Sequence, residues 1–174
     1  MQQRLVQLSL LLAATALLSA CGFQLRGTGG VAVSDEWRSM YLVTSNPNSE
    51  FSREIKVRFA ANGVEWEEDK SAANYSVYLG GERFSQRNLS LNSEARAAEF
   101  ELTMLSTFSV KDNTGQMMID NTTMSVVKQM ENDPRNVVGK AEEIRILKGE
   151  MRSELAQNIM RRIAFFAAAQ EQEP

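Results

Sequence analysis

Apolar and polar residues alternate along residues 99–110, and this is the most regular pattern in the chain. A repeat of two places one set of side chains on each face of a β-strand. The apolar set is Phe100, Leu102, Met104, Phe108 and Val110, and the polar set includes Glu99, Glu101, Thr103, Thr107 and Ser109. The pattern therefore predicts a long antiparallel strand with one buried face, which needs both partner strands and a covering layer.

Partner strands are predicted on both sides of this segment. Residues 111–115 (KDNTG) have hairpin-turn chemistry, and residues 116–130 then return with a weaker alternation around Met124 and Val126. Before the long strand, Tyr75, Val77 and Leu79 share one face of a strand that continues past two glycines to Arg87.

The N-terminal part of the domain follows the order strand, helix, short strand. Residues 39–44 are β-branched and aromatic, which is typical of a first strand. Residues 46–49 (NPNS) are a helix-start signal, and Phe51, Ile55 and Phe59 then recur every four residues on one helix face. Gly63 is expected to end the helix in the left-handed conformation, and residues 64–66 are expected to form a short second strand.

A second, much longer helix is predicted over residues 134–168. Asp133 suits the N-cap and Pro134 the first helical position. Apolar residues follow at spacings of three and four: Val137, Ala141, Ile144, Leu147, Met151, Leu155, Ile159, Ile163 and Phe166. The other face is expected to be charged, with Lys140, Glu142, Glu143, Arg145, Lys148, Glu150, Arg152, Glu154, Arg161 and Arg162.

These elements predict an α+β fold, a two-layer sandwich. Its sheet is expected to be mostly antiparallel with about four strands, and both helices are expected on one face. The opposite sheet face would carry polar and small residues with a few aromatics, either solvated or available for docking. One domain is expected over residues 37–168, after a tether at 21–36 and before a polar tail at 169–174.

The first 20 residues resemble a bacterial lipoprotein signal. They carry one cation, Arg4, an apolar run at residues 10–18, and Ser19-Ala20 before Cys21, the only cysteine. The run is shorter than the ~20 residues that span a bilayer. The resemblance implies cleavage before Cys21, a diacylglycerol on its thiol and an acyl chain on its new amine. Gly22, where Asp would mean inner-membrane retention, implies lipid anchoring in the outer membrane on the periplasmic side. The alternative is a structural cysteine after an ordinary secretory signal.

Composition argues against an enzyme and against most cofactor sites. The chain has no histidine, and Cys21 leaves no second cysteine for a disulfide or a thiolate metal site. No G-x-S-x-G motif occurs, and the adjacent acids at 67–69 and 142–143 suit a solvated surface. Loss of Arg4 with the signal leaves 18 basic and 22 acidic residues, a net charge of −4 that disfavours nucleic acid. A binding or assembly protein without cofactor or metal is therefore expected.

Several short motifs resemble the LptE family of lipopolysaccharide-assembly lipoproteins. Residues 21–27 (CGFQLRG) are similar to the start of the mature family sequence, and residues 59–64 (FAANGV) to its Leu-x-x-Asn-Gly-Val motif. Residues 98–100 (AEF) resemble the Ala-Glu-Tyr that begins a central strand, and residues 132–134 (NDP) with Lys140 resemble the start of the last helix. The four motifs occur in the family's order across residues 21–168.

The resemblance implies that the chain is a plug and assembly factor for the outer-membrane β-barrel LptD. It also implies that the chain itself binds lipopolysaccharide. It also implies a fold with two helices against a mostly four-stranded sheet. A lipid anchor at Cys21 would then hold the protein beside the barrel that it enters.

Candidate lipopolysaccharide ligands are cations, because this lipid carries phosphates and carboxylates beside its acyl chains. Lys140 matches a family position linked to binding and lies near a helix N-terminus, where anions are favoured. The family also has a cation in the loop before the long strand. The ungapped match there falls on Ser93, so Arg96 and Arg87 are the candidates. The alternative for each of the three is a solvated surface cation.

Two other classes of function remain open at this point. One is a generic outer-membrane lipoprotein that scaffolds another envelope complex, of the secretin-pilotin or transporter-auxiliary type. The other is a periplasmic hydrolase, against which the missing histidine, the missing free cysteine and the missing nucleophile motifs argue. Capture of a large β-barrel protein would support the plug and assembly hypothesis over the generic scaffold hypothesis.

Overall fold

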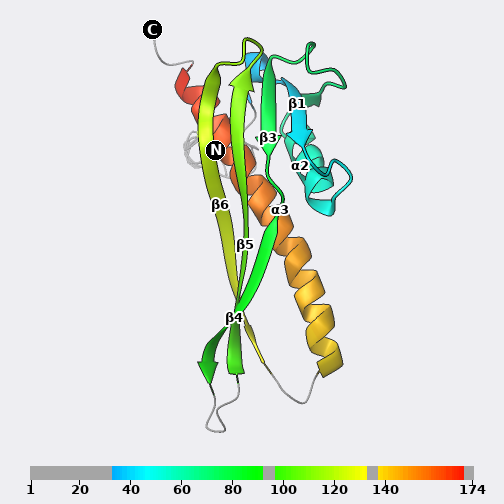
Figure 1. Ribbon diagram of the computed structural model, residues 1–174, viewed down its shortest axis with the longest axis vertical. Coiled ribbons are helices and arrows are strands. Elements are labelled where there is room, and N and C mark those ends of the chain that lie inside the picture. Colours follow the sequence, from blue (N-terminus) through cyan, green and yellow to red (C-terminus); the bar gives the residue numbers. More distant parts are fainter. Residues whose placement is uncertain (1–32, 92–96, 133–136, 171–174) are drawn as a thin grey trace, which may run out of the picture. The chain divides into compact units, whose positions relative to one another are not determined.

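The computed structural model describes residues 33–91, 97–132 and 137–170. They lie in one compact unit, Val31–Pro174. A short 3-10 helix, η1 (Asp35–Trp37), precedes strand β1 (Ser39–Thr44), helix α2 (Glu50–Ala60) and strand β2 (Glu65–Trp66). Strands β3 (Tyr75–Leu79), β4 (Arg83–Leu91), β5 (Ala97–Asp112) and β6 (Met117–Glu131) follow, and helix α3 (Val137–Gln170) is last. Figure 1 shows both α-helices against the same face of one sheet.

The hairpin of β5 and β6 is the centre of the sheet. The two strands pair antiparallel from Glu99↔Glu131 to Lys111↔Met117, so the alternation at residues 99–110 is confirmed as a long strand. The turn depends on Asp112, whose carboxylate accepts hydrogen bonds from the backbone N–H groups of Thr114 and Gln116. A hydrogen bond from the Thr114 hydroxyl, together with these backbone bonds, keeps the pKa of Asp112 below its usual value. Gly115 has φ of 90°, the left-handed value that the turn needs.

Strands β3 and β4 share the other edge of β5. Strand β3 pairs with residues 108–112 and β4 with residues 97–105, both antiparallel. The strand predicted to continue past Gly80-Gly81 therefore keeps its direction but breaks at residues 80–82. At the break, Gly80 N–H donates to the carbonyl of Thr107 (2.8 Å), and the buried Ser106 hydroxyl donates to the carbonyl of Gly80 (2.9 Å).

The sheet differs from the expected one in strand number and direction. It has six strands rather than about four. Hydrogen-bonded neighbours follow the order β2-β1-β3-β5-β4, and β6 also pairs with β5. Strand β1 runs parallel to both β2 and β3, so the sheet is mixed rather than mostly antiparallel. Helix α2 returns the chain to the same end of the sheet, so β2 runs parallel to β1. The connection over residues 67–74 then passes β1 and starts β3 in the same direction.

Helix α2 begins and ends where the sequence predicts. Ser49 is the N-cap, and its side chain accepts a hydrogen bond from Ser52 N–H at 3.0 Å. Phe51, Ile55 and Phe59 are almost fully buried, as their spacing requires. Gly63, with φ of 92°, lets the chain turn into β2. The predicted first strand and short second strand are likewise present as β1 and β2.

Helix α3 supplies the largest part of the covering layer. It runs for 34 residues, or about 51 Å at 1.5 Å per residue. From Gly139 onward, where burial is described, its fully buried residues begin at Met151 and include Leu155, Ile159 and Ile163, which pack with the apolar face of β5. The N-cap predicted at Asp133 and Pro134 lies outside the described residues. Among the residues described, no helix is both long enough and apolar enough to cross a membrane.

Trp37 joins three parts of the fold. It is 1% exposed, and its ring stacks on Tyr75 of β3 with centroids 3.8 Å apart, while Phe166 of α3 meets it edge-on at 5.7 Å. Burial raises the pKa of the Tyr75 phenol, which stays protonated and donates to Glu36 (3.0 Å). The second tryptophan, Trp66, is half-buried against Phe59.

Candidate functional site

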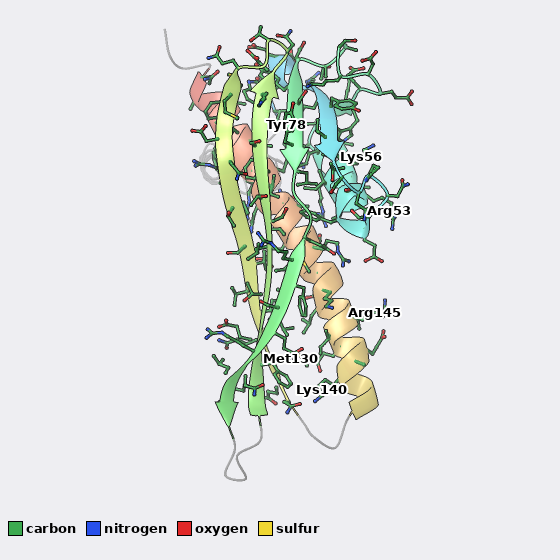
Figure 2. All side chains as sticks on the ribbon, viewed as in Figure 1. Arg53, Lys56, Tyr78, Met130, Lys140 and Arg145 are labelled. Carbon is green, nitrogen blue, oxygen red and sulfur yellow. The ribbon has the colours of Figure 1, made fainter. Side chains whose placement is uncertain are left out.

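Lys140 lies in the first turn of α3 and is half-buried. Figure 2 shows its side chain directed from the helix toward the lower part of the sheet, whereas Arg145 points away from the sheet. The Lys140 ammonium is 5.3 Å from the ring centroid of Phe100 on β5 and donates a hydrogen bond to Asn132 Oδ1. The cation therefore rests on an apolar surface.

The position of Lys140 favours an anion. No acidic residue occupies the first turn of α3 as described, and the N-terminal end of a helix carries partial positive charge. A lysine at this end is unfavourable for the isolated helix, but it adds a full charge to the field that attracts an anion. The ring of Phe100 beside it supplies an apolar contact, so the arrangement suits a ligand that is both anionic and apolar.

Arg87 lies on the opposite face of the sheet from Lys140. It pairs in register with Glu101, whereas its neighbour Asn88 pairs with Phe100, and successive residues of a strand point to opposite faces. Its guanidinium contacts the Glu101 carboxylate at 2.6 Å. The hydrogen bond with Arg87 lowers the pKa of Glu101, which therefore stays ionised and partly neutralises the arginine.

Two sequence candidates cannot be placed in the same way. Arg96 and Cys21 both lie outside the described residues, so their surroundings stay predictions. The structure thus gives a location for Lys140 and Arg87 and does not bring these two together on one face.

The expected charged face of α3 needs correction at Lys148 and Arg152, as well as at Lys140. Lys148 is half-buried, and its ammonium lies 4.0 Å from the ring centroid of Phe84 on β4. The Arg152 side chain is 15% exposed and forms two hydrogen bonds to Glu82, at 2.7 and 2.9 Å, and an ion pair with Glu50. Both face the sheet side, because Lys148 follows Ile144 by four residues and Arg152 follows Lys148 by four, which is the spacing of one helix face. That spacing is the signal that sequence reasoning missed.

The outer sheet face, which neither helix covers, is polar and carries a second group of cations. Tyr78 lies there between Lys70 and Lys111, whose ammonium groups are 5.5 and 5.4 Å from the ring centroid. A shallow depression of about 320 Å³ beside it is lined largely by hydroxyl, amide and small apolar groups: Val43, Thr44, Ser45, Tyr78, Leu79, Gly80, Thr107, Ser109 and Asn121. Within residues 33–91, 97–132 and 137–170, no three acidic or thiol side chains gather as a metal site would require.

One family model matches most of this chain. It is the model named LptE, described as lipopolysaccharide-assembly, and it matches residues 37–163. The matched segment holds β1 to β6, α2 and most of α3, and therefore includes Lys140 and Phe100.

Individual relatives give the same result. The LPS-assembly lipoprotein LptE of Photorhabdus laumondii is 26% identical over 176 aligned positions, gaps included, and the alignment covers 95% of this chain and 89% of the relative. The protein of the same name from Yersinia pestis is 28% identical over 170 residues, covering 94% of this chain and 78% of the relative.

Solved structures share the fold. The rare lipoprotein B from Shewanella oneidensis superposes with a TM-score of 0.67 at 25% identity, covering 76% of this chain and 98% of that one. An uncharacterized lipoprotein B from Nitrosomonas europaea gives a TM-score of 0.71 at 17% identity, over 85% of this chain and 94% of that one, and shows the fold alone.

Proposed function

Since this chain belongs to the LptE family of lipopolysaccharide-assembly proteins, we propose that it is an outer-membrane lipoprotein that binds lipopolysaccharide and assembles with an LptD-like β-barrel. Cys21 is the proposed anchor, through a diacylglycerol and an N-linked acyl chain, because two or three chains hold a protein stably on a membrane where one does not. The protein works by binding and scaffolding, without catalysis and without a resident cofactor or metal.

The observation that carries the binding proposal is the half-buried Lys140 over the ring of Phe100. Lipopolysaccharide presents phosphates next to acyl chains, so its binding site must offer a cation beside an apolar surface. Lys140 and Phe100 offer both within one contact, at the helix end that also favours an anion. Arg96 is the second proposed ligand. Arg87 is the weakest of the three, because Glu101 already pairs with it.

The partner is tested by affinity capture from membranes. The tagged chain is expected in the outer-membrane fraction, and detergent extraction followed by capture is expected to bring down a large β-barrel protein. The Cys21→Ser variant is the matched control for the anchor: it cannot be acylated, so only the part that the barrel holds is expected to stay in the outer-membrane fraction. Capture of a different envelope complex, or of no barrel, would favour the generic scaffold function instead.

Lys140→Glu is expected to weaken lipopolysaccharide binding about tenfold or more, because it replaces an attraction to phosphate with a repulsion. Binding of purified protein to labelled lipopolysaccharide measures the loss. Arg145→Glu is the matched control, since it makes the same charge change on the same helix at a side chain that points away from the sheet. Arg96→Glu is tested in parallel. Unchanged binding by both Lys140→Glu and Arg96→Glu would remove them as ligands, provided that the melting temperatures match the wild type.

A further inference from the structure

The N-terminal half of α3 carries lysines where its C-terminal half carries buried apolar residues. Lys140, Ile144, Lys148 and Met151 recur at spacings of four, four and three, so they share one side of the helix. Further along this side the residues are fully buried, as Leu155 is. Ile144 and Leu147, by contrast, are only partly buried and pack against the edge of the core.

The sheet opposite these lysines is partly uncovered. Gln86 of β4 pairs with the buried Leu102, and Asn88 pairs with Phe100, so both polar residues point to the helix side of the sheet. Both are nevertheless exposed. The N-terminal half of α3 therefore leaves this side of β4 open to solvent, although the same helix buries the sheet further along.

Two lysine–aromatic contacts border this open region. Lys140 lies over Phe100 at 5.3 Å and Lys148 over Phe84 at 4.0 Å. With the two partly buried aliphatic residues between the lysines, they form what we term the lysine–phenylalanine strip: Lys140, Ile144, Leu147 and Lys148 of α3, with Phe84 of β4 and Phe100 of β5. It is an apolar surface with a positive charge at each end.

The Lys148 ammonium lacks a counter-ion within the described part of the chain. It forms neither an ion pair nor a hydrogen bond with another described residue, and its contact there is the ring of Phe84. Nearby carboxylates are engaged elsewhere, because Glu150 pairs with Lys128 and Glu82 with Arg152. A half-buried ammonium pays a desolvation cost that a ring face offsets only in part, so an added anion at this position would be stabilised.

We propose that the lysine–phenylalanine strip binds the acylated, doubly phosphorylated lipid A part of lipopolysaccharide, and that Lys148 contacts a second phosphate. This inference rests on the proposed function, and it adds a residue and a geometry to it. Lys140 and Lys148 are eight residues apart, or about 12 Å along the helix axis. Each lysine contacts one of the two phosphates, and the apolar side chains between the lysines contact the acyl chains.

The test measures the binding of lysine variants to lipid A that carries either two phosphates or one. Lys148→Met keeps the length and packing of the side chain but removes its charge, and it is expected to weaken binding of diphosphoryl lipid A about tenfold. Lys148→Arg is expected to retain binding. Lys56→Met, which removes an exposed lysine from α2, is expected to bind like the wild type. Melting temperatures check that each variant is folded.

Monophosphoryl lipid A identifies the partner of each lysine. With this ligand, one of the variants Lys140→Met and Lys148→Met is expected to bind like the wild type, because its phosphate is already missing, while the other still loses affinity. Wild-type affinity of Lys148→Met for the diphosphoryl ligand would overturn the inference and leave Lys140 as the ligand. Equal losses by both variants with both ligands would also overturn it. Absence of binding by the wild-type protein would instead contradict the proposed function.

Discussion

Trp37→Ala is expected to lower the free energy of unfolding by about 3–5 kcal/mol, the usual cost of removing a buried tryptophan. The residue is 1% exposed and contacts two parts of the fold that are distant in sequence, through Tyr75 of β3 and Phe166 of α3. Truncation removes both ring contacts and leaves a cavity between the sheet and the end of the long helix. Urea unfolding followed by circular dichroism measures the change, and the melting temperature is expected to fall by about 10 °C.

Trp66→Ala is the matched control for this prediction. The same residue type is removed, but Trp66 is only half-buried. In the wild type it contacts one ring, Phe59, and donates one hydrogen bond to the carbonyl of Lys56. A loss of about 1–2 kcal/mol is expected there, by its smaller buried area. Trp37→Phe should lie between the two, because it retains an aromatic ring against Tyr75. Equal losses for Trp37→Ala and Trp66→Ala would show that η1 does not join the sheet to α3.

Local patterns predicted the elements of this fold well, because each pattern reports which face of an element is buried. The alternation around Met104 gave β5, and the spacing of Phe51 and Ile55 gave the buried face of α2. Turn chemistry was equally informative, since Gly63 and Gly115 adopt the left-handed conformation where the sequence predicts a change of direction. These signals depend only on neighbouring residues.

The pairing of strands was less predictable, because it depends on residues far apart in sequence. The parallel register of β1 with β3 joins Met40 to Tyr75, and the segment between them gives no local sign of it. The same limit applies to the candidate site. In the sequence Lys148 is one of many charges on the helix, and its contact with Phe84 depends on the position of β4. Arg87 reads as a free cation until β5 places Glu101 beside it.

Gly80→Val is expected to destabilise the fold by about 3 kcal/mol, because the site has no room for a side chain. A Cβ atom at Gly80 would lie 2.4 Å from Thr107 Oγ1 and 3.2 Å from the Thr107 carbonyl oxygen. The backbone cannot easily retreat, since Gly80 N–H donates to that carbonyl and the buried Ser106 hydroxyl donates to the carbonyl of Gly80. The clash therefore acts at the break between β3 and β4, where β4 replaces β3 along the same edge of β5.

Gly81→Val separates this clash from a general need for flexible glycines. A Cβ atom at Gly81 would meet nothing within 4 Å, so its replacement is expected to cost about 1 kcal/mol or less. Thr107→Ala removes the nearest atom and is expected to recover part of the loss when combined with Gly80→Val, which a double-mutant cycle of unfolding free energies measures. Full additivity of the two changes would exclude the contact with Thr107 as the cause. Equal destabilisation at positions 80 and 81 would point instead to the conformational freedom of the break between the strands.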